Sequence, residues 1–214
     1  EQVVAEISKY FGGWTGRGNQ VVQELPLYHS NQLERIKEIE QAHVCLGVKG
    51  IPRSDDRKYP LLVLNNILGG GMSSRLFQEL REERGLVYTT YTYHAAYHDT
   101  GVFGVYAGTS REKIPEVIMV VQEQFADILD NDVAEEELNR AKEQIKASLV
   151  LNLENTSSRM GRLGKAELFG EKVKSPNELI AIIDNITTDA VVEIARGILT
   201  QEYSTAMVLP KGEV

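Results

Sequence analysis

Residues 69–88 read GGGMSSRLFQELREERGLVY and form the most informative stretch of the chain. The three glycines predict a tight helix–helix turn that needs positive φ. The residues after them predict a short helix that starts at Ser73-Ser74 and ends at Arg84-Gly85. The glycines do not form a phosphate-binding loop, because no lysine follows them and the segment before them is helical. Beyond Gly85, the Thr- and Tyr-rich residues 87–97 predict a strand.

The regions on either side of this stretch predict one sheet and several helices. Apolar and polar residues alternate over residues 42–48, as in a strand with one buried face. A helix capped by Ser54 or Asp55 follows, with Pro60 in its first turn. The other predicted elements are a strand at 101–108, helices at 111–129, 134–154, 157–169, 176–185 and 188–199, and a last strand at 203–209. A strand hairpin beside separate runs of helices favours an α+β fold, with an antiparallel sheet covered by several helices.

The N-terminal residues predict a separate piece of structure. Residues 3–11 repeat apolar side chains at helical spacing and stop at Gly12-Gly13. No capping residue precedes this helix, which suggests that the chain begins inside a helix and that an upstream segment was removed. Residues 14–31 are rich in glycine and polar side chains and predict a surface linker.

The composition argues against several classes of function. The 214 residues carry a net charge of −8 with a pI near 5.1, which disfavours nucleic acid as a partner. No apolar run is long enough to cross a bilayer, and no signal-peptide pattern opens the chain. Cys45 is the single cysteine, so an internal disulfide is impossible. This usage fits a reducing compartment, and we expect a cytoplasmic protein with no membrane partner.

Metal ligands are sparse in the sequence. Of the four histidines, His94 and His98 fall in a predicted strand and the turn after it, roughly 13 Å apart along an extended chain. His43 and Cys45 share one strand face, but two ligands fall short of a four-coordinate zinc site. We therefore expect no metal site within this chain.

Arg81 and Tyr88 are the residues that best suit chemistry. They are seven positions apart, and the turn at Arg84-Gly85 folds the chain back between them. A guanidinium fork and a phenolic donor together suit an acceptor such as a peptide carbonyl or its oxyanion. The structural alternative is that Arg81 pairs with a neighbouring glutamate of its helix while Tyr88 packs half-buried.

The pattern Gly-Gly-x-Met-Ser-Ser-Arg-Leu-Phe-x-Glu-Leu-Arg-x-x-x-Gly-Leu-x-Tyr resembles the signature of the second half of insulinase/pitrilysin-type zinc metallopeptidases, the inverzincins. The similarity extends over the whole C-terminal domain and is greatest to bacterial processing-type proteases. In that family two homologous half-domains close like a clamshell around an unfolded peptide. The resemblance implies that residues 1–31 are the last helix of a preceding domain plus a linker, and that residues 32–214 form the C-terminal metallopeptidase-like domain.

The resemblance also implies a division of labour between the halves. The zinc-binding His-x-x-Glu-His motif belongs to the first half, and nothing in this sequence matches it. The implied zinc therefore lies in an N-terminal half, either upstream in the same gene and removed or on a partner chain. The resemblance is compatible with a homodimer or a heterodimer. Arg81 and Tyr88 match the second half's catalytic and substrate-binding pair, which would position an unfolded peptide or presequence. The isolated chain would then be inactive. The alternative is a non-catalytic structural or partner subunit, as in respiratory-complex core proteins.

Overall fold

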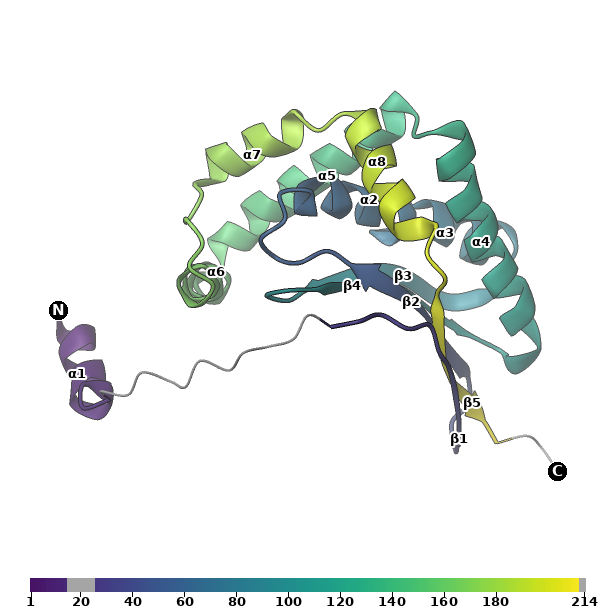
Figure 1. Cartoon of the computed structure of the whole chain (residues 1–214), viewed down its shortest axis with the longest axis horizontal. Helices are drawn as coiled ribbons and strands as arrows, with labels where there is room; N and C mark the ends of the chain where they lie inside the picture. Colours follow the sequence, from purple (N-terminus) through teal and green to yellow (C-terminus); the bar gives the residue numbers. More distant parts are fainter. Residues whose placement is uncertain (15–25, 212–214) are drawn as a thin grey trace.

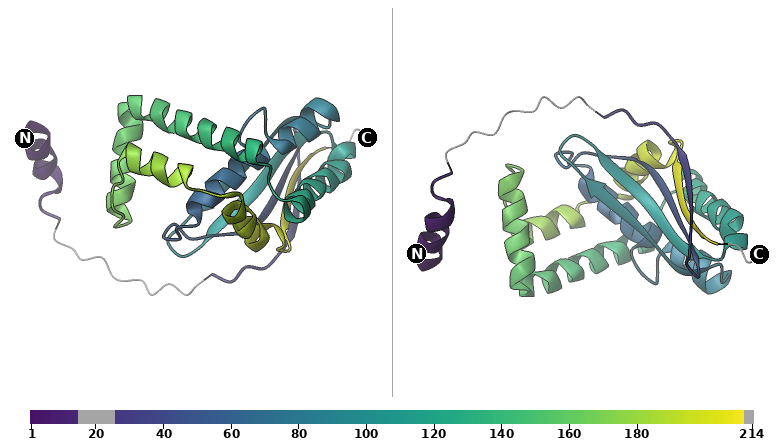
Figure 2. Two further views of the ribbon diagram at one scale, coloured as in Figure 1. Left: turned by 90° about the horizontal axis from the view of Figure 1, so that it is seen from above. Right: turned by 90° about the horizontal axis from the view of Figure 1, so that it is seen from below.

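A computed structural model describes residues 1–14 and 26–211. Its main body has two layers, a five-stranded sheet with helices stacked on one of its faces (Figure 1). The view from below in Figure 2 looks onto the strands, and the view from above looks onto the helices. The predicted α+β fold, a sheet covered by several helices, is confirmed.

The elements follow the predicted order closely. Two short segments are not α-helical: η1, a π-helical turn, and η2, a 3-10 turn. The bounds are α1 Gln2–Phe11, β1 Gln32–Lys37, β2 Ala42–Gly50, α2 Lys58–Gly69, α3 Arg75–Phe77, η1 Gln78–Glu83, β3 Val87–Ala96, β4 Gly101–Thr109, η2 Arg111–Lys113, α4 Ile114–Asn131, α5 Glu135–Glu154, α6 Thr156–Leu168, α7 Pro176–Asp184, α8 Thr188–Leu199 and β5 Ser204–Pro210.

The strand order is β1-β5-β2-β4-β3, so β3 and β1 are the two edges of the sheet. Strands β2, β3, β4 and β5 pair antiparallel, as predicted, whereas β1 pairs parallel to β5. Strand β1 was not predicted from the sequence. All six of its side chains are exposed, so its residues carry no alternating pattern that would indicate a buried face.

The core lies between the sheet and the helices. Alternate residues of β2 and β4, such as Val44, Leu46 and Phe103, point toward the helices and are almost fully buried. Leu61 and Leu64 of α2 meet them from the helical layer and are 0–1% exposed. Burial of each such side chain stabilises the fold by about 1.5–3 kcal/mol. This packing fixes which face of the sheet remains free for a ligand.

The glycine run is required for a reason other than the predicted one. None of Gly69, Gly70 and Gly71 has positive φ, so the predicted left-handed turn is wrong. Instead, the end of α2 passes directly over β3. A Cβ on Gly69 would lie 2.4 Å from the backbone nitrogen of Thr92, and only a glycine permits that approach. Positive φ occurs further on, at Gly85 (φ +59°), where the chain turns from η1 into β3.

Two helix starts also differ from the sequence prediction. Helix α2 begins at Lys58, with Pro60 in its first turn, rather than directly after Ser54 or Asp55. The Asp55 carboxylate still contacts the start of the helix, because it accepts a hydrogen bond from the Arg57 amide at 2.9 Å. The predicted helix after the glycines is split into the short α3 and the π-helical turn η1.

The N-terminal segment packs differently from the rest of the chain. Helix α1 forms as predicted, but none of its residues is buried, including its apolar stripe. Most of the predicted linker, residues 15–25, lies outside the described residues. The end of that linker contacts the sheet, because the Tyr28 hydroxyl lies 2.8 Å from the Glu202 carbonyl oxygen and 3.1 Å from that of Gly47.

Candidate functional site

The face of the sheet opposite the helices carries a cluster of aromatic side chains. Because side chains alternate along a strand, the residues between the core positions of β2, β3 and β4 point to this open face. We call the following residues the open-face cluster: His43 and Cys45 of β2, Tyr91 and Tyr93 of β3, and Tyr106 of β4.

Contacts within the open-face cluster hold its rings in place. The His43 Nδ1 atom lies 2.7 Å from the Tyr106 hydroxyl. The Tyr106 ring stacks on that of Tyr91, with 4.9 Å between ring centroids. The Tyr93 ring lies over Gly104, where a Cβ would come within 2.7 Å of the Tyr93 Cζ atom. The glycine therefore allows the ring to lie flat on the sheet.

The Cys45 thiol and the Tyr93 and Tyr106 phenols of the open-face cluster are uncharged near pH 7. Burial raises the pKa of the Cys45 thiol, and a hydrogen bond with Tyr93 offsets this only in part. Burial also raises the pKa of Tyr93 and of Tyr106, and nearby tyrosine and cysteine groups add to the shift. The face thus presents aromatic surface and uncharged hydrogen-bonding groups, which suit a peptide better than an ion.

Arg81 lies in the π-helical turn η1 with its guanidinium exposed. Its Cζ atom sits 5.0 Å from the centroid of the Phe77 ring. Among the described residues, Arg81 forms no ion pair. The nearby Glu79 pairs with Arg84 instead, at 3.3 Å. The pairing of Arg81 with a helix glutamate, the structural alternative, is therefore not observed. π-Helical turns are often found at functional sites.

Tyr88 is the extra residue of a β-bulge at the start of β3. Val87 pairs with Thr109 and Thr89 with Gly108, which leaves Tyr88 without a partner across the ladder. Its side chain is 66% exposed rather than half-buried. No hydrogen bond joins Arg81 and Tyr88 in the part of the chain that the structure describes. Both side chains are accessible donors near one end of the edge strand.

The turn between these two residues is held firmly. The Leu86 amide donates to the Leu80 carbonyl at 2.7 Å, and the Thr109 hydroxyl donates to the Leu86 carbonyl at 2.5 Å. The Lys113 ammonium donates to the Gly85 carbonyl at 2.9 Å. A fixed backbone at this point positions the two donors without a direct contact between them.

Comparisons with known proteins show which family has this sequence and fold. A family model described as the peptidase M16 inactive domain matches residues 1–145. The chain belongs to this family. A protein of Bacillus subtilis named as an uncharacterised zinc protease (YmxG) is 40% identical over 214 residues, which are 100% of this chain and 52% of that protein. One of Streptomyces coelicolor, also named as an uncharacterised zinc protease, is 40% identical over 81% of this chain and 38% of its own length. This M16 inactive domain therefore spans about half the length of the curated relatives it matches, or less.

Solved structures share the fold. A peptidase M16 inactive domain from Pseudomonas fluorescens superposes with a TM-score of 0.78 at 24% identity, over 88% of this chain and 46% of that one. A chain of Complex III2 from Candida albicans gives a TM-score of 0.75 at 19% identity, over 85% of this chain and 46% of that one. The predicted membership of the zinc metallopeptidase family, as its second half-domain, is confirmed.

The histidines of this M16 inactive domain do not converge. His43 lies on the open face, whereas His94 pairs with Phe103 and points to the helical layer, where burial lowers its pKa. His98 lies in the turn after β3. Within residues 1–14 and 26–211, no group of three or more His, Cys, Asp or Glu could hold a metal ion. Among the same residues, no helix is long and apolar enough to span a membrane.

The open-face cluster was not identified from the sequence. Its residues were visible as the polar and aromatic half of the strand alternation. The order of the strands was needed to show that Tyr91, Tyr93 and Tyr106 come together with His43.

Proposed function

We propose that this chain is the substrate-binding half of a two-half zinc endopeptidase that cleaves unfolded peptides or presequences. The observation that carries the proposal is the state of Arg81 and Tyr88. Both lie within the family signature, both are exposed, and neither side chain has a hydrogen-bond or ion-pair partner among the described residues, although Arg81 lies over the Phe77 ring. A donor pair held ready in this way suits the carbonyl or oxyanion of a peptide.

The location of β3 supports peptide binding at this site. As an edge strand it has one row of backbone groups without a strand partner, to which an extended peptide can add by strand pairing. Tyr88 is the second residue of this strand, and Tyr91 and Tyr93 lie further along its open face. A peptide beside β3 would meet aromatic surface for its side chains and the Arg81 and Tyr88 donors for its backbone.

The length of the relatives supports the proposal that a second, zinc-bearing half completes the enzyme. Proteins named as zinc proteases are about twice as long as this chain, and its described residues bring no metal ligands together. In the proposed enzyme, zinc bound by the other half supplies the activation of water. Arg81 and Tyr88 bind and orient the peptide backbone. The other half is either upstream in the same chain or a separate subunit, and a cytoplasmic location belongs to this proposal.

The alternative is a non-catalytic structural or partner subunit. One observation favours it: a chain of Complex III2 shares this fold, so the fold also occurs in a protein complex that is not named as a protease. In such a subunit Arg81 and Tyr88 would have no substrate to contact.

Turnover of an unstructured fluorogenic peptide by the protein joined to its zinc-bearing half tests the proposal. Arg81→Met and Tyr88→Phe should each lower kcat/KM by about 10-fold to 100-fold or more, since each removes one donor to the reacting group. Arg196→Met and Tyr10→Phe are matched controls at exposed positions in α8 and α1, outside η1 and β3, and should keep normal turnover. Unchanged turnover in both site variants would leave the structural-subunit alternative.

Cys45 offers a second readout. It is the only cysteine and belongs to the open-face cluster beside Tyr93. A bound, uncleaved peptide should slow its alkylation in wild type and slow it less in Arg81→Met. Equal alkylation rates with and without a saturating peptide would place the peptide away from this face.

A further inference from the structure

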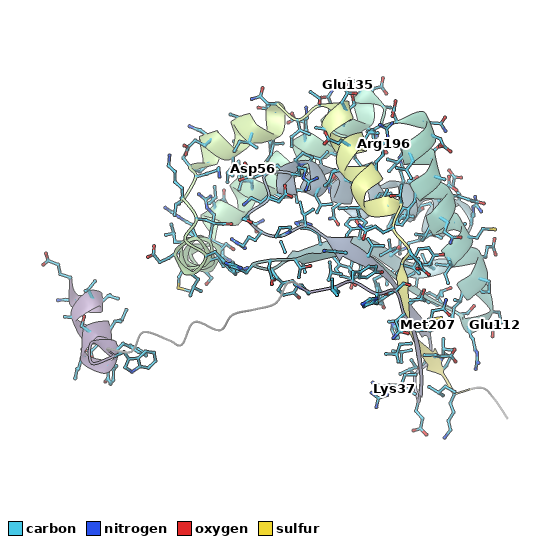
Figure 3. All side chains as sticks on the ribbon, in the orientation of Figure 1. Lys37, Asp56, Glu112, Glu135, Arg196 and Met207 are labelled. Carbon is cyan, nitrogen blue, oxygen red and sulfur yellow. The ribbon has the colours of Figure 1, made fainter. Side chains whose placement is uncertain are left out.

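A cavity that is chemically different from the open-face cluster lies at the end of the helical layer. It has a volume of about 120 Å³ and is bounded by the segment that leads into α2, by α6 and by the α6–α7 connection. Asp56, labelled in Figure 3, lies in the segment that leads into α2 and lines an adjoining cavity. The charged residues that line the cavity of about 120 Å³ are Arg53, Lys58, Arg162, Lys172, Lys174 and one acid, Glu171. Five cations against one carboxylate stand out in a chain whose net charge is −8.

The single carboxylate of this cavity is already neutralised. Glu171 accepts two hydrogen bonds from the Arg53 guanidinium, at 3.1 and 3.0 Å, and a third from the Lys58 ammonium at 3.3 Å. These groups outweigh burial and lower the pKa of Glu171, so it remains ionised and bound to both cations. The positive charge of Arg162, Lys172 and Lys174 is therefore not balanced inside the cavity.

Arg162 provides the strongest sign of a missing partner. Its Nη2 atom donates to the Lys174 carbonyl oxygen, which fixes the guanidinium. Its Nη1 atom is buried and has no hydrogen-bond acceptor among the described residues. A buried charged donor without an acceptor costs free energy, and a bound anion would supply the acceptor.

The two lysines have weak partners. Lys172 is 4.0 Å from Glu178 with a side chain that is 84% exposed, so this pair adds little. The Lys174 ammonium lies 5.8 Å from the centroid of the Tyr59 ring and makes no ion pair within the described part of the chain.

We propose that this cavity binds the phosphate group of a small phosphorylated molecule. One guanidinium and two ammonium groups carry more charge than a carboxylate balances, and they suit a dianion with several acceptor oxygens. An adjoining cavity of about 330 Å³ shares Arg53, Glu171 and the three lysines of the first and is also lined by Asp56, His98 and Phe169. The Arg53 guanidinium stacks 4.4 Å from the centroid of the Phe169 ring. The organic part of the ligand occupies this outer space.

Calorimetric titration of the 214-residue chain with inorganic phosphate and with pyrophosphate, against acetate at equal ionic strength, tests the proposal. The expected result is saturable binding of the phosphates and none of acetate. Arg162→Gln should weaken phosphate binding at least tenfold, and Lys174→Gln severalfold. Arg159→Gln and Lys165→Gln, exposed on the same helix and outside the cavity lining, should leave it unchanged.

Two results would overturn the assignment. Equal binding of acetate would mean that the cavity does not select phosphate. Unchanged affinity in both Arg162→Gln and Lys174→Gln would mean that phosphate binds elsewhere. Lys174→Gln keeps the backbone carbonyl that Arg162 contacts, so it tests the cavity even if Arg162→Gln unfolds. The cavity contains neither Arg81 nor Tyr88, so these outcomes do not bear on the peptidase proposal.

Discussion

Arg75 and Glu137 form a two-pronged ion pair between α3 and α5. The Arg75 Nε and Nη2 atoms donate to the two carboxylate oxygens of Glu137 at 2.9 and 2.7 Å. A third bond, from Nη1 to Asp127 at 2.6 Å, reaches α4. The two partners of the pair are only 15% and 14% exposed. The first arginine of the signature therefore ties three helices together, while the second, Arg81, makes no ion pair with any described residue.

This contrast predicts opposite effects on stability for the two arginines. Arg75→Met should lower the free energy of unfolding by about 2–4 kcal/mol, because it leaves the largely buried Glu137 carboxylate without its arginine partner. Arg81→Met should change it by no more than about 0.5 kcal/mol, as expected of an exposed side chain. Urea unfolding of both variants measures the difference. A loss of stability in Arg81→Met comparable to that in Arg75→Met would assign Arg81 a structural role.

The close passage of α2 over β3 predicts that Gly69 tolerates no side chain. Gly69→Ala should destabilise the domain by about 1–3 kcal/mol, since its Cβ would overlap the Thr92 backbone rather than a flexible side chain. Gly161→Ala is the matched control. It lies within α6 with nothing within 4 Å of the added Cβ, so it should stabilise by roughly 0.5–1 kcal/mol through helix propensity. Thermal unfolding compares the two, and a neutral Gly69→Ala would contradict the packing explanation.

The raised pKa of Cys45 predicts a slow thiol. At neutral pH the thiol should be protonated, so its alkylation by iodoacetamide should be slower than that of free cysteine. The alkylation rate should increase only when the pH exceeds the usual range of thiol pKa values. Tyr93→Phe removes the hydrogen bond that lowers this pKa, so alkylation at a given pH should slow further. Mass spectrometry of the single labelled peptide gives the rates. A Cys45 that reacts as fast as free cysteine at neutral pH would show that burial does not control it.

The ion pairs of Glu171 predict a pH-dependent contribution to stability. Because the folded-state pKa of Glu171 is lowered, its contribution is fully present above the ordinary carboxyl range, near pH 4, and is lost as the pH falls through the lowered value. The difference in Tm between wild type and Glu171→Gln should therefore be largest at neutral pH and shrink in acid. Calorimetry across this range measures it, and a difference that does not vary with pH would argue against the lowered pKa.

Much of the fold could be predicted because its signals are local. The alternation at residues 42–48 and the apolar spacing of the five C-terminal helices depend on neighbours within one element, and each of these elements was found. Strand β1 could not be predicted, because an exposed edge strand has no buried face to leave a pattern. The candidate residues Arg81 and Tyr88 came from a signature and from donor chemistry, and both stand where a ligand can reach them.

The sequence by itself determined the family, the order of most elements and the candidate pair, since each is encoded over a short span. The tertiary structure alone decided which signature arginine is structural, because Glu137 is 62 positions from Arg75. It also decided why Gly69 is a glycine, since the clash is with a strand 23 residues later. The convergence of Arg162 with Lys172, Lys174 and the segment before α2 likewise depends on how the helices pack. Contacts between distant segments follow from packing geometry, which the pattern within any one segment does not contain.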